Sequence, residues 1–226
     1  MKRQVYVISA GRYDKLPFTD EQKANYIFCV KDGEGQKYRD AACAQVYESG
    51  KLVESRNFAL EHAFERGVMC IQLSDDLKSV HYNKNFGQKK IVSTDHAISD
   101  IASKFSGIKG IKLLGIPPTN NDFFAKHLVS KNSFCIGDAL FIKPNPLRFD
   151  EQLTLKEDYD YTLQHIQKYG TLRYQKYLFE FDHYTNSGGA VDIRNSKEEE
   201  RNIRILIGKW GDRIKLNPKR KNEILI

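Results

Sequence analysis

Short apolar runs, rich in β-branched and aromatic residues, alternate with a segment of helical periodicity in the first third of the chain. The helical segment, residues 55–66, places Leu60, Ala63 and Phe64 on one face, and Ser55 is a suitable N-cap. The predicted strands around it are residues 5–8, 26–30 and 68–73. This alternation is typical of βαβ units and predicts an α/β fold with a mostly parallel sheet flanked by helices.

The later part of the chain continues with further strands and helices. Periodicity and capping residues predict helices at 94–105, 158–169 and 197–210, and strands at 111–116, 134–142 and 177–181. The charged start of the last helix is interpreted as a solvated face. Residues 184–195 have turn composition and predict a mobile loop, with a plain surface loop as the alternative.

Composition limits the classes of protein that the chain can belong to. It has 226 residues, 40% of them hydrophobic, which is enough for one sizeable core, so we expect a single domain. No apolar run approaches the roughly 18 residues of a membrane span, and no signal peptide is visible, so we expect a cytoplasmic protein that contacts no membrane. A net charge of +7 favours a polyanionic partner.

The cysteines do not suggest a metal site or a disulfide framework. Cys29, Cys43, Cys70 and Cys135 are widely spaced, and three of them lie in apolar strand-like runs. We therefore expect small core residues.

Two adjacent carboxylates follow directly on a predicted strand. Asp75 and Asp76 come after residues 68–73, at the carboxyl end of a strand, where ligands gather in α/β sheets. Neighbouring carboxylates repel each other, and a cation compensates their charge. Oxygen ligands suit Mg²⁺ or Mn²⁺, which binds one or two carboxylates together with substrate phosphates. The alternative is a solvated turn or a helix cap.

Several weaker motifs occur in a particular order around this pair. A strand ends in Ser9-Ala10-Gly11-Arg12, a second ends in Lys31-Asp32, and Ser55-Arg56-Asn57 opens a helix before the strand that leads to Ser74-Asp75-Asp76. This order resembles the GT-A fold of nucleotide-sugar glycosyltransferases, a Rossmann-like architecture, over residues 3 to about 185. Residues 67–77, residues 156–163 and the ending Lys209-Trp210-Gly211 resemble most closely the TET/JBP-associated glycosyltransferase family of phages.

The resemblance implies a metal site and different functions for the two halves of the chain. Asp76 matches the metal-ligating second carboxylate of the DxD motif, and Asp75 would contact the ribose or share the ion. Ser74 stands where many relatives have an acid. His183 occupies the place of a late metal ligand in several GT-A enzymes, although a lone histidine is more often structural. Residues 1–77 would form the nucleotide-binding half, and residues 78–226 the acceptor half, with the loop 184–195 and a C-terminal helix and basic tail.

A catalytic base is expected at the start of the helix 158–169. Lys156-Glu157-Asp158 resembles the acidic motif that supplies the base in inverting GT-A enzymes, and the helix dipole stabilises a carboxylate there. Tyr159, Leu163 and Ile166 are predicted to form the buried stripe, with Asp158 at its flank and Glu157 pointing further away. We therefore expect Asp158 to be the base and Glu157 the second candidate. The alternative is that both acids only favour the helix start.

Further polar residues are predicted to bind the nucleotide sugar because of their places in the motif order. Arg12 suits the diphosphate, Asp32 the nucleotide base and Asp138 a sugar hydroxyl. The complete predicted set is Ser9, Arg12, Asp32, Arg56, Asn57, Asp75 and Asp138. Ordinary surface polarity is the alternative for most of them.

The family resemblance implies transfer of a sugar from a nucleotide-sugar donor, expected to be UDP-linked, onto 5-hydroxymethylpyrimidine in DNA with inversion. It also places the protein in the host cytoplasm if a phage encodes it. The basic side chains predicted to contact DNA are Lys84, Lys89, Lys90, Lys219, Arg220 and Lys221. Two alternatives remain open: a GT-A enzyme acting on protein or cell-envelope glycan, and a non-catalytic nucleic-acid-binding module.

Overall fold

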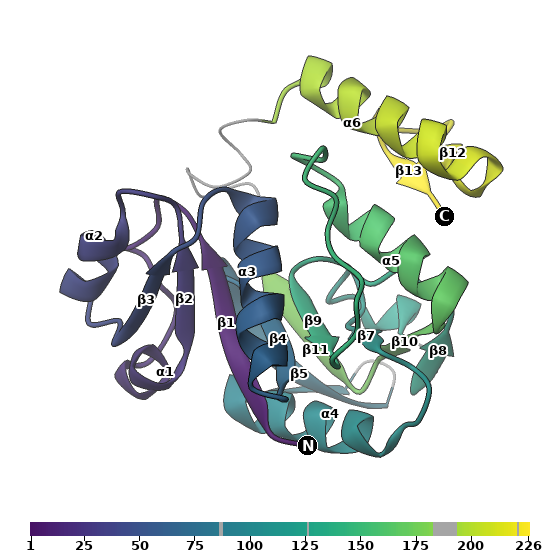
Figure 1. The fold of residues 1–226 in the computed structure, drawn as a ribbon. Coiled ribbons are helices and arrows are strands. Elements are labelled where there is room, and N and C mark those ends of the chain that lie inside the picture. Colours follow the sequence, from purple (N-terminus) through teal and green to yellow (C-terminus); the bar gives the residue numbers. More distant parts are fainter. Residues whose placement is uncertain (86–87, 126, 183–193, 221) are drawn as a thin grey trace.

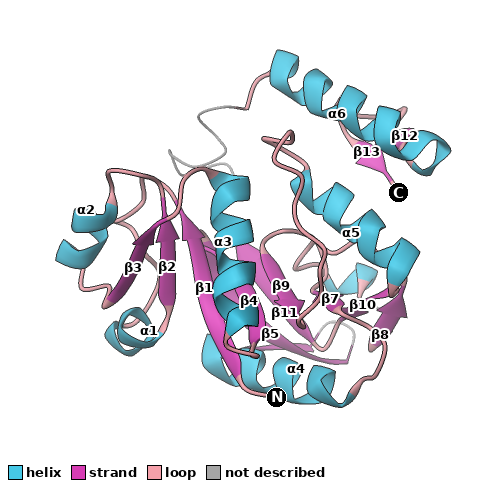
Figure 2. Ribbon diagram, viewed as in Figure 1, coloured by secondary structure: helices cyan, strands magenta, loops and turns pink. Residues whose placement is uncertain are grey.

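A computed structural model describes residues 1–85, 88–125, 127–182, 194–220 and 222–226. One mixed sheet of eight strands runs through the molecule (Figures 1 and 2). Its strands, in spatial order, are β3 (Gln45–Glu48), β2 (Ile27–Val30), β1 (Arg3–Ser9), β4 (Met69–Ser74), β9 (Ala139–Ile142), β7 (Leu113–Gly115), β10 (Thr171–Tyr174) and β8 (Val129–Lys131). The predicted α/β class with a mostly parallel sheet flanked by helices is confirmed.

The first four strands of this order are parallel to one another, whereas β9 runs antiparallel to both β4 and β7. A smaller antiparallel sheet has the order β11 (Tyr177–Phe181), β5 (Leu77–Asn85), β6 (Gln88–Val92), and a third pairs β12 (Lys215–Leu216) with β13 (Ile224–Leu225). The two predicted halves of the chain share the main sheet, because β4 of the first half pairs with β9 of the second.

The helices are α1 (Asp20–Asn25), α2 (Gly35–Asp40), α3 (Leu52–Glu65), α4 (Thr94–Gly107), α5 (Glu157–Lys168) and α6 (Ser196–Trp210), with 3-10 turns η1 (Asp122–Phe124) and η3 (Gly211–Arg213). Within the described ranges, no helix has the length and apolar content needed to cross a membrane.

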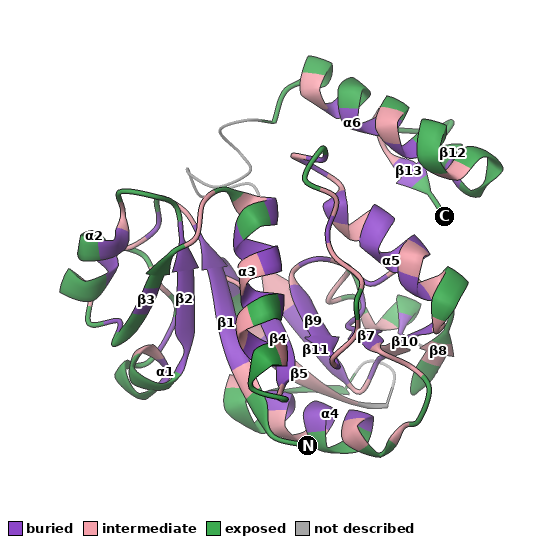
Figure 3. Ribbon diagram, in the orientation of Figure 1, coloured by how far each residue is buried: buried purple, intermediate pink, exposed green. Residues whose placement is uncertain are grey.

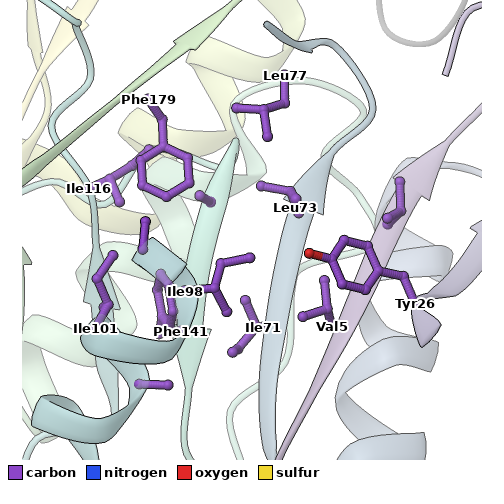
Figure 4. Close-up of a cluster of buried hydrophobic side chains, with 14 of the residues drawn as sticks. Val5, Tyr26, Ile71, Leu73, Leu77, Ile98, Ile101, Ile116, Phe141 and Phe179 are labelled. Carbon is purple, nitrogen blue, oxygen red and sulfur yellow. The ribbon is translucent and has the colours of Figure 1, made fainter. Parts of the chain in front are cut away.

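Alternation of side chains along the central strands divides the core between the two faces of the sheet. Val5 and Val7 of β1 join the cluster that α4 and the small sheet cover, part of which is drawn in Figure 4. Tyr6 and Ile8 of the same strand face the cluster beneath α3. The four cysteines are free and buried, as predicted.

Two predicted element boundaries are wrong in ways that affect the site. The helix of the first third begins at Leu52 with Lys51 as N-cap, so Ser55 is a buried residue inside α3 and not its cap. The predicted strand 134–142 is a strand only from Ala139 onward. Its first residues form a loop that leads to the end of β4.

Candidate functional site

The carboxyl ends of β1 and β4 and the start of β9 meet at one edge of the sheet. β1 and β4 are parallel, so their ends coincide, and antiparallel β9 begins where β4 ends. The backbone N–H of Ser74 donates to the carbonyl of Asp138 at 2.8 Å. Ligands in α/β proteins bind at such carboxyl edges, and the predicted carboxylates lie there.

Asp75 is buried at this edge and held on both carboxylate oxygens. Oδ1 accepts from Nη1 of Arg12 at 2.5 Å, and Oδ2 accepts from the Ser9 hydroxyl. Ser9 also lies 2.5 Å from the hydroxyl of Tyr38. Burial raises the pKa of Asp75 to about 6, against the lowering effect of the Arg12 charge. A raised pKa means that the ionised carboxylate is incompletely compensated.

Asp76 lies beside Asp75 and shares its guanidinium partner. Its Oδ1 accepts from the Ser74 hydroxyl at 2.5 Å, and Oδ2 is 3.5 Å from Nη1 of Arg12. The backbone N–H of Asp182, just after β11, donates to the Asp76 carbonyl at 2.9 Å. The end of the small sheet therefore joins the same edge.

The two aspartates and Arg12 carry formal charges of −2 and +1, hence −1 in total. A site of this kind fits a divalent cation that takes one or two protein carboxylates and completes its shell with phosphate oxygens. Among the described residues, no group of three or more His, Cys, Asp and Glu side chains could hold a metal alone. His183, the predicted third ligand, lies outside the described residues.

A second buried network lies next to this edge and centres on Arg56. Its Nε donates to Oε1 of Glu157 at 2.9 Å, and its Nη1 donates to the side chain of Gln72 and the carbonyl of Gly137, each at 3.1 Å. Gln72 in turn donates to the Arg56 carbonyl at 2.8 Å. This guanidinium therefore joins α3, β4, the loop before β9 and the start of α5.

Asp158 is the half-buried carboxylate of this region. Its Oδ2 accepts from the Gly137 N–H at 2.9 Å, and its Oδ1 accepts from the N–H of Tyr159 at 3.0 Å. Burial, followed by the negative charge of Glu157, raises the pKa of Asp158 to about 7, although Gly137 and Arg56 act in the opposite direction. A carboxylate with this pKa is suited to accept a proton near neutral pH.

The prediction that Glu157 points away from the core is wrong. Helix α5 is buried on two sides: Tyr161 and His165 face the main sheet and α3, while Tyr159 and Leu163 pack against α6. Glu157 lies one turn before Tyr161, on the sheet-facing side, where Arg56 pairs with it. Tyr159 and Leu163 of the predicted stripe therefore make the α6 contact, and Glu157 has a guanidinium as its structural partner.

The prediction that Arg56 and Asn57 open this helix is wrong. Both residues lie in the second turn of α3. Asn57 accepts from the Phe149 N–H at 2.9 Å and donates to the Phe149 carbonyl at 3.0 Å, which fixes the loop after β9 to α3. Asn57 lines a surface cavity formed with residues 148–152 and not the Asp75 edge. Asp32 is exposed, and its Oδ1 accepts from the Gly50 N–H at 3.1 Å.

Some of the basic residues predicted to contact DNA are exposed. These are Lys89 and Lys90 on β6 and Lys219 and Arg220 between β12 and β13. Lys84 belongs to β5, but its side chain lies outside what the structure describes. The same is true of Lys221 and of residues 184–193 of the predicted loop. Asn195, the last residue of that loop, is the N-cap of α6.

Sequence reasoning missed two polar residues of the edge. Gln72 is fully buried in β4, and a glutamine within an otherwise apolar strand is a signal that could have revealed it. Tyr38 gave no such signal, because its hydroxyl reaches Ser9 and Arg12 only through the packing of α2 on the sheet.

Comparison with known proteins adds little to this geometry. No protein family and no curated protein matches the sequence. Among solved structures, the chain is similar to the crystal structure of mannose-1-phosphate geranyltransferase from Thermus thermophilus, at 11% sequence identity and a TM-score of 0.36. The match covers 92% of this chain and 65% of that chain. So distant a likeness carries no argument about activity.

Proposed function

We propose that the protein is a metal-dependent glycosyltransferase that moves a sugar from a nucleotide sugar onto a hydroxyl of 5-hydroxymethylpyrimidine in DNA. One observation carries the proposal. Two adjacent carboxylates and a third carboxylate with a pKa of about 7 lie around the same sheet edge, linked through the Ser74–Asp138 and Gly137–Asp158 hydrogen bonds. The first pair suits a cation and phosphate, and the third suits a proton acceptor.

On the donor side, Asp76 would hold a Mn²⁺ or Mg²⁺ ion, with Asp75 as the second carboxylate. Such an ion would neutralise the charge that develops on the leaving nucleoside diphosphate. Arg12 stabilises the two carboxylates as anions, and its guanidinium suits the diphosphate as well. Ser9 and Tyr38 fix the orientation of Asp75.

On the acceptor side, Asp158 accepts the proton of the attacking hydroxyl. The oxygen forms a bond to the anomeric carbon as the bond from that carbon to the diphosphate oxygen breaks, and Asp158 later releases the proton to water. In-line attack of this kind inverts the anomeric configuration. Product anomericity, measured by NMR, tests the step, and retention would exclude this role of Asp158.

The DNA acceptor is supported by the family resemblance and by the positive net charge. A hydroxymethylated base within a duplex has to leave the stack to reach the sheet edge, which costs a few kcal/mol. Single-stranded or mismatched DNA should therefore be modified faster than matched duplex.

The proposal is tested by incubating the protein with Mn²⁺, a panel of sugar nucleotides and DNA that contains hydroxymethylcytosine or hydroxymethyluracil. Mass spectrometry of the nucleosides should show the added mass of one sugar. Transfer to peptides or glycans but not to DNA would show that the acceptor is protein or cell-envelope glycan, the first alternative. Absence of transfer to any acceptor, with DNA binding intact, would favour the non-catalytic module.

A further inference from the structure

Positive charge is concentrated in the last part of the chain. Residues 194–226 contain ten Lys or Arg and five Asp or Glu, a net charge of +5. The whole chain has 36 Lys or Arg and 29 Asp or Glu, so residues 1–193 contain 26 basic and 24 acidic residues, a net charge of +2. Most of the excess charge of the protein therefore belongs to α6 and the segment that follows it.

Three of the four basic residues of α6 lie on one side of the helix. Lys197, Arg201 and Arg204 are exposed, and their spacing of four and three residues places them in one row along the helix. At a rise of about 1.5 Å per residue this row is about 10 Å long. Two acidic residues lie beside it: the exposed Glu200, and Glu198, which accepts from Arg201 at 2.7 Å.

The opposite side of α6 is occupied by the protein itself. Ile203 and Leu206 are buried in a cluster with Leu163 of α5 and Ile214 (Figure 3). Because this apolar side is covered, α6 does not offer it to a bilayer, as a helix lying in a membrane interface would. A hydrated polyanion, contacted through side-chain charge alone, is the partner that fits such a surface.

The covered side of α6 contacts the segment that leads to the proposed base. Glu199 of α6 is 2.6 Å from Nζ of Lys156, and Asn202 accepts from the Thr154 N–H at 2.9 Å. Residues 154–156 lead directly into the start of α5, where Asp158 lies. The basic row lies on the other side of α6, about one helix diameter, roughly 10 Å, from residues 154–156.

We propose that the outward row of α6, with Lys197 and Arg204 as its principal contacts, binds the phosphate backbone of the DNA acceptor next to Asp158. This inference rests on the proposed DNA acceptor and names the surface that receives it. The sequence pattern predicts a solvated helical face here, and none of the three residues of the row belongs to the predicted DNA contacts. Phosphate contacts would position the strand, while the sheet edge selects the base.

The test measures binding alone, without donor or metal, so that it does not depend on turnover. Fluorescence anisotropy compares the affinity for a labelled hydroxymethylcytosine-containing oligonucleotide of the unaltered protein and of the double variant Lys197→Gln/Arg204→Gln. Arg201 is left in place because it donates to Glu198 at 2.7 Å and to the Gln152 carbonyl at 3.0 Å. The matched control is Lys37→Gln/Arg39→Gln, which removes the same charge from α2, far from α6 in Figure 1.

We expect the α6 variant to bind about 10- to 100-fold more weakly near 0.1 M salt and to reduce the slope of log affinity against log salt by roughly 1.8, since each phosphate contact contributes about 0.9. The control variant Lys37→Gln/Arg39→Gln should change the DNA affinity and the salt slope only slightly. Circular dichroism should show both variants folded, because all four side chains are exposed.

Equal losses in both double variants would overturn the proposal, because they would show that only total charge matters. Undetectable DNA binding by the unaltered protein would overturn it too. So would binding to vesicles containing phosphatidylglycerol that depends on Lys197 and Arg204 in the absence of DNA binding, which would assign the surface to a membrane. Failure of the glycosyltransferase proposal is distinguishable, because α6-dependent binding would then persist without sugar transfer.

Discussion

The backbone N–H of Gly137 donates to the carboxylate of Asp158 at 2.9 Å, while the carbonyl of the same glycine accepts from Arg56 at 3.1 Å. One residue thus connects the proposed base to the buried guanidinium that pairs with Glu157. The two neighbouring acids at the start of α5 are therefore unequal: Glu157 has a full positive charge as its partner, and Asp158 has neutral amides. This inequality is the physical basis for distinguishing a structural acid, Glu157, from the proposed base, Asp158.

The first prediction concerns the pH dependence of turnover. A carboxylate base acts only when ionised, so if Asp158 is the base the rate should rise with pH through about 7, the pKa of Asp158 in the protein. Glu157→Gln removes the negative neighbour that raises this pKa, so the rising limb should move to lower pH with activity retained. Asp158→Asn should lower the rate about 10²- to 10⁴-fold at every pH, the usual contribution of a general base. A pH–rate profile of all three proteins checks this.

The reverse pattern would contradict the assignment. If Glu157→Gln abolished transfer and Asp158→Asn retained it, Glu157 would be the base despite its pairing with Arg56. Binding of the donor, measured by calorimetry, serves as the control for a misfolded site.

The second prediction concerns stability against pH. Both Asp75 and Asp158 have pKa values raised above those of the unfolded chain, to about 6 and about 7. The folded protein therefore holds protons that the unfolded chain has already lost, and this contribution disappears as the pH rises from about 4 through 7. We expect the melting temperature to fall between pH 5 and pH 8, and to fall less in Asp158→Asn. Calorimetric scans at both pH values give the two differences, and an equal fall in both proteins would contradict the raised pKa of Asp158.

The sequence sufficed to predict the parts of the site that follow from strand direction. Asp75 and Asp76 lie at the sheet edge because β1 and β4 are parallel, a consequence of the βαβ pattern. The orientation of Glu157 was not predictable in the same way. Its partner Arg56 is 101 positions away in the chain, and helical periodicity alone does not reveal which of two buried sides of α5 faces the sheet.

Asn57 is a second residue whose contacts could not be predicted from the sequence. Its position beside Arg56 suggested a shared pocket, but successive residues of a helix point about 100° apart, so only Arg56 reaches the region of Gly137. Asn57 instead holds the backbone of Phe149. Motif order located the correct helix, but it did not show that these two neighbouring side chains reach different regions.

The third prediction tests the Arg56–Glu157 pair by a double-mutant cycle. Arg56→Met leaves the buried Glu157 without its guanidinium partner and should lower the free energy of unfolding by about 3–5 kcal/mol. The double variant Arg56→Met/Glu157→Gln removes the stranded charge and should recover part of this loss. Urea unfolding at pH 8 measures the free energy of unfolding of these two variants, of the single variant Glu157→Gln and of the unaltered protein. Additive effects of the two single substitutions would show that the pair is not coupled.

The fourth prediction concerns the space beside Gly137. A Cβ on this residue would lie 2.5 Å from Nη2 of Arg56, and that guanidinium is held by buried hydrogen bonds. Gly137→Ala should therefore destabilise the fold by about 1–3 kcal/mol, as overpacking does. The matched control is Gly107→Ala at the end of α4, where an added Cβ meets nothing within 4 Å and should cost nothing. Equal unfolding free energies of the two variants would contradict the close approach of Arg56.

The fifth prediction isolates the role of Asp76 from catalysis. If Asp76 and Asp75 hold a cation that binds a nucleoside diphosphate, UDP and Mn²⁺ together should raise the melting temperature more than the sum of their separate effects. A ligand present at about 100 times its dissociation constant stabilises the folded state by about 2.7 kcal/mol, so the shift should be several degrees. Asp76→Asn should lose the joint effect, because an amide oxygen is a weaker ligand than a carboxylate. Asp40→Asn, a change of the same charge on an exposed residue of α2, should keep it. A joint shift that survives in Asp76→Asn would place the nucleotide elsewhere and remove the donor half of the proposed mechanism.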